Sequence, residues 1–269
     1  MSLSTRPQWA QTQTDLTGKT VLVIGGAGGV GEGVVRAALD AGARAVAVGR
    51  RRERLDELAA RIPHPQLVVD TIDALSVDLT ARSAKLAERF GPFDGVIVSV
   101  ASWGGQGRKP ALELTDTEWN DLLASNLTAV FRLYRAFIPH LAGRGILLQL
   151  NGMSAEIPFP GAAGRALTAA AQKSLTRTIA AELGEGGPRV YEVILGMIRT
   201  RARRLAGTDD PGWIPASDVG WHVADLIAGT SPLAGNDLHY FVDVSAGPEG
   251  ADSMRPLALP RPAGAAGAR

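Results

Sequence analysis

The sequence predicts an α/β fold built on a doubly wound parallel sheet of about seven strands, with helices on both faces in three layers. Short, continuously apolar runs alternate with helix-length segments, which is typical of strands buried on both faces of a parallel sheet. A glycine-rich turn follows the first of these runs directly. The 269 residues, 45% of them hydrophobic, are enough for one large domain with a substantial core.

Seven short segments rich in aliphatic or β-branched residues are the expected strands. In chain order they are Thr20–Ile24, Ala45–Val48, Gln66–Val69, Val96–Ser99, Ile146–Leu150, Val190–Leu195 and Leu238–Val242. The expected helices include Gly29–Ala41, Arg52–Arg61 and Gly164–Leu183. Thr115 followed by Glu118 forms a capping-box pattern, which predicts a further helix beginning at Asp116. Repeated strand–helix units imply right-handed crossovers and therefore the doubly wound arrangement.

The chain is expected to form one domain with two loose ends. Residues 1–15 are polar and rich in Gln and Thr, which predicts a flexible N-terminal arm. Residues 16–246 hold all the alternating segments and form the single domain. Residues 247–269 are rich in Pro, Gly and Ala without periodicity, which predicts a flexible tail.

Composition and charge exclude several classes of function. A formal net charge of +1 provides no electrostatic basis for binding nucleic acid or a membrane surface. The chain contains no cysteine, and its four histidines lack metal-ligand spacing, so no metal site is expected. No apolar run approaches bilayer-spanning length and the N-terminus lacks the apolar core of a signal peptide, so we expect a cytoplasmic protein.

The glycine-rich turn predicts a phosphate-binding site. Glycine permits positive φ, and it lets the backbone approach a pyrophosphate that a Cβ would keep away. A helix beginning at about Gly29 would direct its free N–H groups toward that phosphate. We therefore expect a Rossmann-like dinucleotide site; a merely tight strand–helix turn is the alternative. Its first predicted residues are Gly25, Gly28, Gly29, Val30 and Gly31.

The end of the second strand favours NADP(H) over NAD(H). An NAD-specific site places an Asp or Glu here to accept from the ribose 2′-OH, but this chain has Gly49. Arg50 and Arg51 follow it and offer charge-assisted hydrogen bonds to a 2′-phosphate. The alternative is that these arginines belong to the solvated face of the next helix.

With these motifs, the chain resembles the short-chain dehydrogenase/reductase family, and the resemblance extends over nearly the whole domain. The spacing Gly25-x-x-x-Gly29-x-Gly31 matches the family's glycine motif. Asp70-Thr71 resembles the pair that contacts the adenine ring, and Ser99-Val100-Ala101 stands where the family has Asn-Asn-Ala-Gly.

Two later segments extend the resemblance. Asn126 matches the family's structural and catalytic asparagine, and Ile198 and Thr200 match the segment that closes over the nicotinamide. The resemblance implies a small-molecule substrate. It also implies a homodimer or homotetramer, formed through the helices that contain Phe131–Leu141 and Ala166–Ala180.

The resemblance breaks at the catalytic residues. The family uses a Ser, a Tyr as acid/base and a Lys four residues after the Tyr, and the Lys lowers the pKa of the phenol. The pattern Leu175-Thr176-Arg177 sets the register, which places Arg165 at the tyrosine, Ala169 at the lysine and Gly152 at the serine. No Tyr-x-x-x-Lys occurs anywhere in the chain.

Arg165 is the principal candidate for a replacement function. An arginine stays protonated and cannot act as a tyrosine-like acid, but its planar fork suits a carboxylate, phosphate or enolate oxygen. The alternative is a surface or subunit-interface residue. Asn126 remains a candidate catalytic residue, although a structural role in bonding backbone at a helix junction is favoured. Further groups expected nearby are Asn151, Met153, Ser154, Glu156, Ser99, Ser102 and Trp103, whereas Lys173, one turn beyond Ala169, is expected to be exposed or to face another subunit.

Three functions remain open. The first is an atypical NADP(H)-dependent oxidoreductase that acts on a small carbonyl or hydroxyl compound, acidic ones included. The second is a non-redox enzyme on the same fold, such as a cyclase, isomerase or lyase. The third is a catalytically inert binding or partner subunit. The first is preferred, because a preserved 2′-phosphate site has little purpose in an inert subunit.

Overall fold

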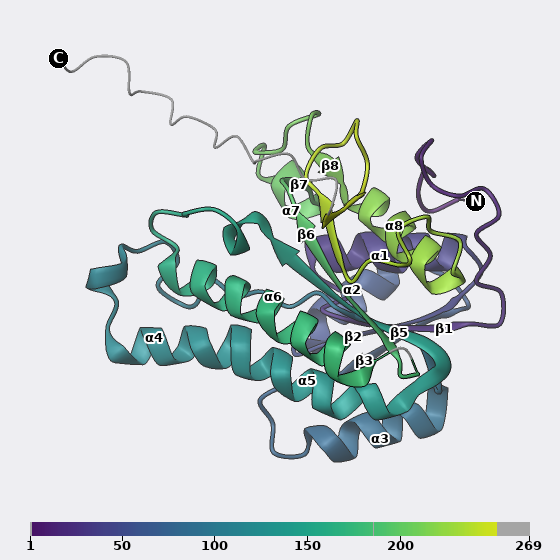
Figure 1. The fold of residues 1–269 in the computed structure, drawn as a ribbon, viewed down its shortest axis with the longest axis horizontal. Helices are drawn as coiled ribbons and strands as arrows, with labels where there is room; N and C mark the ends of the chain where they lie inside the picture. The colour runs from purple at the N-terminus through teal and green to yellow at the C-terminus, as the bar shows by residue number, and fades with distance from the viewer. Residues whose placement is uncertain (1, 185, 252–269) are drawn as a thin grey trace.

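An eight-stranded sheet with helices on both faces forms the centre of the computed structural model, which describes residues 2–184 and 186–251 (Figure 1). The strand order is β10-β9-β6-β5-β4-β1-β2-β3, and all pairings are parallel except that of β10 with β9. The strands are β1 (Thr20–Ile24), β2 (Arg44–Gly49), β3 (Leu67–Thr71), β4 (Phe93–Val98), β5 (Leu141–Gly152), β6 (Arg189–Leu195), β9 (Leu238–Phe241) and β10 (Glu249–Gly250). The expected doubly wound α/β fold is confirmed.

The alternation of side chains along β1 produces the three layers. Val21 and Val23 contribute to the core on one face, beneath α1, α2 and α8. Leu22 and Ile24 contribute to the core on the other face, beneath α3, α5 and α6. All five residues of β1 are buried, as expected for a central strand of a parallel sheet. The main helices are α1 (Gly29–Asp40), α2 (Arg52–Arg61), α3 (Leu79–Phe90), α4 (Asp116–Leu123), α5 (Ala129–Phe137), α6 (Ala163–Leu183) and α8 (Ala216–Ala228).

Shorter elements connect these layers. In the sequence, a five-residue helix, α7 (Arg201–Leu205), separates two short strands, β7 (Ile198–Arg199) and β8 (Ile214–Pro215). These two strands pair in parallel and form a small second sheet. A π-helical turn, η2 (Ala124–Thr128), links α4 to α5. The other short turns are η1 (Ala111–Glu113), η3 (Ile138–His140) and η4 (Met153–Ala155). The predicted capping box at Thr115 and Glu118 is present, and α4 begins at Asp116 as expected.

The N-terminal residues differ from the expectation of a flexible arm. Residues 2–15 lie against the domain, and Ala10 and Thr14 are buried. The Thr14 hydroxyl donates to Asp225 Oδ1 over 2.5 Å, and the Arg6 guanidinium lies 4.2 Å from the centre of the Trp221 ring. Isolated apolar side chains such as Trp9, which packs against the core, hold a segment whose overall composition is polar.

The start of the predicted C-terminal tail also carries structure. Glu249 and Gly250 form β10, which pairs antiparallel with β9 and makes the sheet one strand larger than expected. A strand of two residues is too short to produce a periodic pattern, so the sequence could not predict it. The rest of the predicted tail, residues 252–269, lies outside the described residues.

Within the part of the chain that the structure describes, no helix combines the length and apolarity needed to cross a bilayer.

Candidate active site

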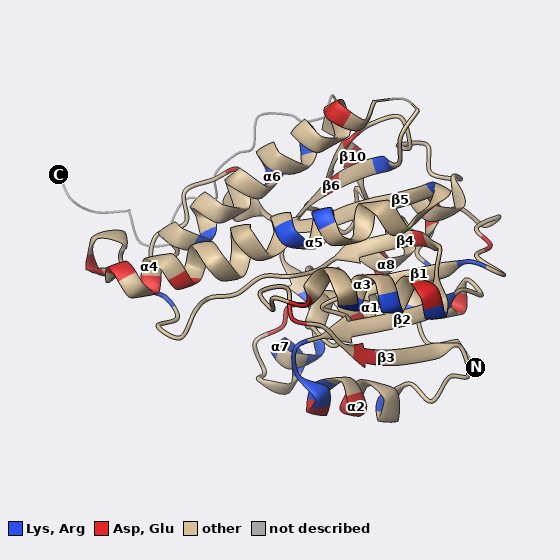
Figure 2. Cartoon of the chain, turned by 90° about the horizontal axis from the view of Figure 1, so that it is seen from below, with Lys and Arg blue, Asp and Glu red and all other residues tan. Residues whose placement is uncertain are grey.

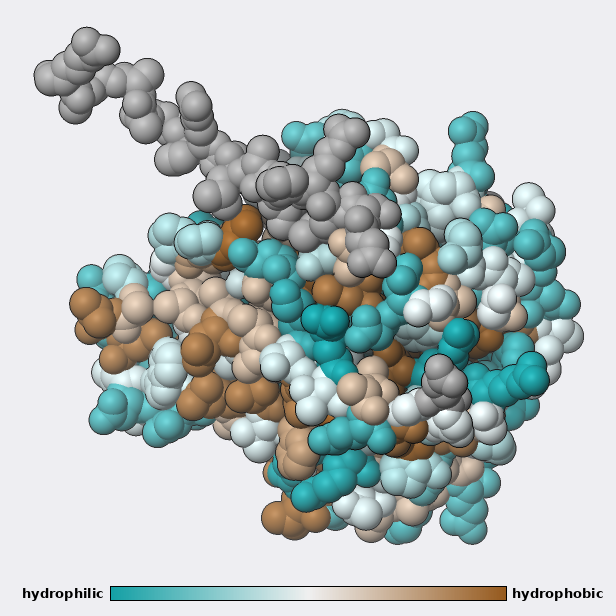
Figure 3. Space-filling model, in the orientation of Figure 1, coloured by the Kyte–Doolittle hydropathy of each residue, from teal (hydrophilic) through white to brown (hydrophobic). Residues whose placement is uncertain are grey.

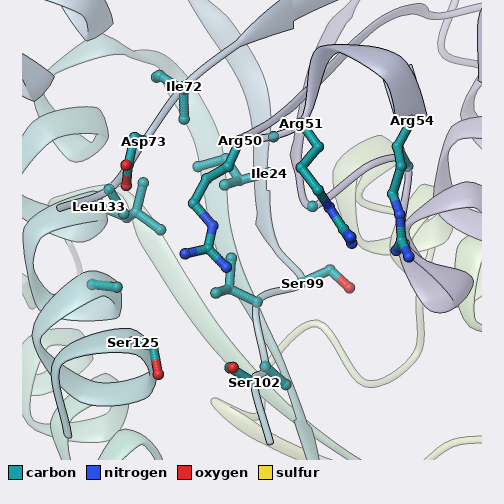
Figure 4. Close-up of a pocket in the computed structure, with 18 of the residues that line it drawn as sticks. Ile24, Arg50, Arg51, Arg54, Ile72, Asp73, Ser99, Ser102, Ser125 and Leu133 are labelled. Carbon is teal, nitrogen blue, oxygen red and sulfur yellow. The ribbon is translucent and has the colours of Figure 1, made fainter. Parts of the chain in front are cut away.

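A cavity of about 230 Å³ lies at the carboxyl ends of β1, β2 and β4. Its wall includes the glycine-rich turn after β1 and the residues that follow β2, β3 and β4 (Figure 4). Residues of η2 and α5 complete it. In open α/β sheets, ligands bind outside the carboxyl ends of the strands where the strand order reverses. Here the order reverses between β4 and β1, so the cavity is at the expected place.

The glycine turn has the geometry that the sequence predicts. Gly25 has a φ of +85°, and a Cβ there would lie 2.2 Å from the carbonyl oxygen of Ser99. A Cβ at Gly31 would lie equally close to the Gly25 carbonyl oxygen. A side chain at either position is therefore excluded by backbone atoms. Gly25 and Gly28 line the cavity.

The first turn of α1 is available to bind an anion. The helix begins at Gly29, as expected, and no side chain among the described residues caps it. The N–H groups of Gly29, Val30 and Gly31 therefore have no intrahelical acceptor, and they carry the positive end of the helix dipole. These features fit a pyrophosphate bound at the N-terminus of α1.

Three arginines lie at the mouth of the cavity. Arg50 and Arg51 line it, together with Arg54 from the first turn of α2 (Figure 4). None of the three forms an ion pair within the described residues, whereas neighbouring Arg52 pairs with Asp56 at 2.9 Å. Arg54 was not predicted; it lies in the first turn of α2, which begins directly after Arg51. Figure 2 shows basic residues at the start of α2 and on α7.

The residues after β4 line the cavity as predicted, but those at the end of β3 do not. Ser99, Val100 and Ala101 all contribute to the wall. The predicted pair Asp70-Thr71 is absent from it, and Ile72 and Asp73 line the cavity instead. The Asp70 carboxylate is engaged elsewhere, because it pairs with Arg82 at 3.1 Å.

Ile198 and Thr200 approach the glycine turn without lining this cavity. A Cβ added at Gly29 would lie 2.6 Å from both Cβ and Cγ2 of Thr200, so the absence of a side chain at Gly29 makes room for that threonine. The Thr200 hydroxyl accepts from the N–H of Arg203 over 3.3 Å and thereby caps α7. Ile198 is buried in β7, and its carbonyl accepts from Arg203 Nη1 over 2.7 Å.

The Asn126 side chain forms hydrogen bonds with backbone groups, which is the structural role that the sequence favoured. It is buried within η2, where its Oδ1 accepts from the Ser102 N–H over 2.7 Å. Its Nδ2 donates to the carbonyls of Ser102 and Leu122 over 3.1 and 3.0 Å. The Asn126 carbonyl accepts from Gln172 Nε2 over 2.7 Å. Asn126 therefore fixes the loop after β4 against the junction of α4 and α5.

The three residues that the sequence register aligns with the family's Ser, Tyr and Lys lie at the end of β5 and in the first two turns of α6. Gly152 is the last residue of β5, and a Cβ there would meet only Ser154 Oγ, at 3.9 Å. Ala169 is buried on α6 and its carbonyl accepts from Asn151 Nδ2 over 2.8 Å. Arg165, in the first turn of α6, is half-buried, and its guanidinium lies 4.9 Å from the centre of the Trp103 ring. Burial, and then the charge of Arg203, lower the pKa of Arg165.

Each of the three tyrosines is engaged with other groups. The hydroxyl of Tyr134 is buried and donates to Gln149 Oε1 over 3.0 Å, and that of Tyr191 donates to the Ala234 carbonyl over 3.0 Å. The Tyr240 hydroxyl donates to Glu156 Oε1 over 3.1 Å.

The phenol of Tyr240 and the ammonium of Lys173 both contact the carboxylate of Glu156. Lys173 Nζ lies 2.6 Å from the same Glu156 oxygen. Burial, and then Glu156, raise the pKa of Tyr240 to about 12. A catalytic tyrosine of the family that the sequence resembles needs the opposite shift. None of these three residues lines the cavity, and neither do Gly152, Arg165 and Ala169.

Comparisons with known proteins show which sequences are similar to this chain. The short chain dehydrogenase family profile matches residues 19–210. A gluconate 5-dehydrogenase from Gluconobacter oxydans is 28% identical over 206 residues, which cover 74% of this chain and 79% of the relative. A 2-(R)-hydroxypropyl-CoM dehydrogenase from Xanthobacter autotrophicus is 29% identical over 238 residues, which cover 82% and 93%.

Solved structures share the fold. One is the NADPH-bound structure of a short chain oxidoreductase from Pseudomonas aeruginosa PAO1 that contains an atypical catalytic center. It superimposes with a TM-score of 0.72 over 86% of this chain and 97% of that one; at 24% identity this likeness concerns the fold alone. A short-chain glucose/ribitol dehydrogenase from Brucella melitensis, 27% identical, has a TM-score of 0.69 over 83% and 93%.

Proposed function

The chain belongs to the short-chain dehydrogenase family, and from this premise we propose that it is an atypical NADP(H)-dependent oxidoreductase. Its substrate would be a small carbonyl or hydroxyl compound, and it would act without the family's tyrosine–lysine pair. The observation that carries the proposal is the group of three arginines without ion-pair partners among the described residues, at the mouth of the cavity. Gly49 provides no acidic side chain at the end of β2.

The residues of the cavity have distinct parts in binding. Arg50, Arg51 and Arg54 would hold the adenosine 2′-phosphate by charge-assisted hydrogen bonds. The N–H groups of the first turn of α1 would hold the pyrophosphate. The nicotinamide, when bound, supplies or accepts the hydride.

The reacting oxygen lacks a positioned acid in this proposal. Gly152, Arg165 and Ala169 stand where Ser, Tyr and Lys are expected, so solvent water would supply or accept the proton. Loss of a positioned acid/base lowers rates by about 10²–10⁴-fold. We therefore expect slow turnover.

The test compares the two dinucleotides by isothermal titration calorimetry. NADPH should bind the wild-type chain at least about tenfold more tightly than NADH, because each charge-assisted contact contributes about 1.5–3 kcal/mol before solvent screening. The double variant Arg51→Ala/Arg54→Ala should lose this preference. Arg52→Ala is the matched control, because Arg52 does not line the cavity, and it should leave both affinities unchanged.

The same titration separates the alternatives. Equal affinity for NADH and NADPH would refute the 2′-phosphate assignment. Tight NADPH binding without turnover of any carbonyl would favour a non-redox enzyme that uses the dinucleotide as a scaffold, or an inert partner subunit. If neither dinucleotide binds, the oxidoreductase proposal is wrong.

A further inference from the structure

A cavity of about 650 Å³ lies against α1, between the N-terminal segment, α7 and the start of α8. We call it the arginine cavity, because five of its lining residues are arginines. It shares no lining residue with the cavity at the carboxyl ends of β1, β2 and β4. Its volume is within the range of small-molecule binding sites. The arginine cavity is therefore a separate candidate site beside the first turn of α1, where Gly29 lines it.

The arginine cavity carries an excess of positive charge. Its arginines come from four elements and are Arg36, Arg61, Arg199, Arg201 and Arg204. Glu32 is the one acidic residue that lines it within residues 2–184 and 186–251. The ion pairs of this region leave part of the positive charge without a counterpart.

Three of the five arginines are neutralised and two are not. Glu32 pairs with Arg36 at 2.7 Å and with Arg61 at 2.8 Å. Arg199 pairs with Asp209 at 3.2 Å. Arg201 and Arg204 have no ion-pair partner in the described part of the chain. These two guanidinium groups give α7 the positive charge visible in Figure 2 and leave an anion as the missing component of the cavity.

The elements around α7 hold Arg201 and Arg204 at the cavity. The two residues are three positions apart in the helix, a spacing that places both side chains on one face. The Thr200 hydroxyl caps α7. The pairing of β7 with β8 sets Arg199 opposite Pro215, which directly precedes α8. The segment that carries the two arginines is thus tied by backbone pairing to the start of α8.

The start of α8 contributes a backbone donor to the same cavity. No side chain among the described residues caps this helix, so the N–H of Ser217 in its first turn has no intrahelical acceptor. A Cβ at Gly33 would lie 2.1 Å from the carbonyl oxygen of Ala216, so α1 packs directly against this turn. Free N–H groups at a helix N-terminus favour a phosphate oxygen, and the helix dipole favours its charge.

We propose that the arginine cavity is a second ligand site, which binds the phosphoryl group of a small phosphorylated molecule through Arg201 and Arg204. A phosphate monoester carries a charge of about −1.5 to −2 at neutral pH, which matches two unpaired guanidinium groups better than a single carboxylate does. Leu205, which is 71% exposed, and Leu3 also line the cavity and would contact the remainder of the molecule.

This site lies next to the glycine turn without being part of the dinucleotide cavity. Arg201 directly follows Thr200, and a Cβ at Gly29 would lie 2.6 Å from Cβ of that threonine. Gly25 and Gly28 line the first cavity and not the arginine cavity. We therefore expect the phosphorylated ligand and a dinucleotide to bind at the same time.

The test measures equilibrium binding of phenyl phosphate by calorimetry. The wild type should bind it saturably, and phenol should bind at least about tenfold more weakly. The double variant Arg201→Gln/Arg204→Gln should weaken phenyl phosphate binding by about tenfold or more. Arg144→Gln, at an exposed residue of β5 outside the cavity, is the matched control and should bind as the wild type does.

A second variant separates loss of charge from loss of structure. Leu205→Glu keeps both arginines and places a carboxylate four residues after Arg201, where it can pair with that guanidinium. It should also weaken phenyl phosphate binding, and its melting temperature should equal that of the wild type because Leu205 is exposed. Raising the salt concentration should weaken binding of phenyl phosphate to the wild type.

The outcomes decide between this site and the dinucleotide cavity. Absence of saturable binding, or full affinity in both the double variant and Leu205→Glu, would overturn the proposal. Loss of phenyl phosphate binding when NADPH is saturating would also overturn it, because the phosphate would then occupy the dinucleotide cavity. Tighter binding of benzoate than of phenyl phosphate would overturn the choice of a phosphoryl group. If NADPH fails to bind but phenyl phosphate still binds through Arg201 and Arg204, the oxidoreductase proposal fails and this site stands.

Discussion

Gly49 stands at the end of β2, between the glycine turn and the three arginines, and lines the cavity. A Cβ built there meets no atom within 4 Å, so the residue is not required by packing. Its consequence is electrostatic, because a carboxylate at this place would accept from a ribose 2′-OH and repel a 2′-phosphate.

Gly49→Asp should therefore change the cofactor preference with little effect on stability. NADPH affinity should fall by about tenfold or more, and NADH affinity should rise. Gly49→Ala, which adds a Cβ without a charge, should keep the preference for NADPH. Titration of both dinucleotides into both variants provides the measurement, and an unchanged preference in Gly49→Asp would place the 2′-phosphate elsewhere.

At the residue scale, the sequence predicted only part of the cavity wall, namely Gly25, Gly28, Arg50, Arg51, Ser99, Val100 and Ala101. Turn chemistry identified Gly25, because positive φ and close backbone approach both demand glycine. The choice of Asp70 was less secure, because a strand end does not reveal which of Asp70 and Asp73 reaches a cavity. That choice depended on Arg82, twelve residues away, which holds the Asp70 carboxylate.

At the scale of elements, α6 packs on the sheet over polar as well as apolar side chains. Glu192, in the middle of β6, is fully buried, and its Oε1 accepts from Asn151 Nδ2 over 2.8 Å. Its other oxygen has no hydrogen-bond partner among the described residues. Burial raises the pKa of Glu192 to about 8, so the carboxyl is protonated in the folded protein near neutral pH.

This burial predicts a loss of stability with rising pH. The pKa of Glu192 is raised from 4.5 in the unfolded chain to about 8 in the folded one, so its contribution is fully present below 4.5 and is lost as the pH rises toward 8. Glu192→Gln keeps the acceptor for Asn151 without the ionisation. The melting temperature of the variant minus that of the wild type should increase from pH 5 to pH 8 and then level off.

A control isolates the buried carboxyl. Glu113→Gln, on an exposed turn, should show no such pH-dependent difference. If the difference for Glu192→Gln is the same at pH 5 and pH 8, the carboxyl does not ionise as the structure indicates.

The elements could be predicted where local pattern and tertiary packing agree. The bounds of β1 and α2 match the expectation to the residue, since an apolar run and a charged amphipathic segment each begin and end sharply. β4 begins three residues earlier than expected because Asp94 interrupts its apolar run. In the structure the Asp94 carboxylate accepts from the Thr20 N–H over 2.9 Å, a long-range contact that composition cannot reveal.

At the scale of the whole molecule, the outer face of α5 and α6 is apolar and open. Phe131 on α5 is 44% exposed, and shallow grooves beside it are lined by residues such as Leu175 and Ile179. Figure 3 shows hydrophobic side chains on the side of the molecule where Figure 1 places these helices. Exposed contiguous apolar surface of this kind favours association of subunits.

Phe131→Arg should therefore weaken self-association. The new charge would lie in an apolar interface beside Arg135, whose guanidinium is 5.5 Å from the Phe131 ring centre in the wild type. Sedimentation velocity should show the wild type as a dimer or tetramer and the variant shifted toward monomer. Val77→Arg, at a 99% exposed residue outside this face, should keep the wild-type assembly. A wild-type monomer, or an unchanged assembly in Phe131→Arg, would contradict this interface.

We propose that the chain keeps a cradle for a 2′-phosphorylated dinucleotide and lacks the family's tyrosine–lysine pair beside it. The most direct test is a crystal structure of the chain with NADPH. It should show the 2′-phosphate between Arg50, Arg51 and Arg54, the pyrophosphate on the first turn of α1, and Arg165 on the side of the nicotinamide where the family has its tyrosine. A nicotinamide facing a tyrosine hydroxyl and a lysine ammonium, or a glycine turn closed to the dinucleotide, would contradict the claim.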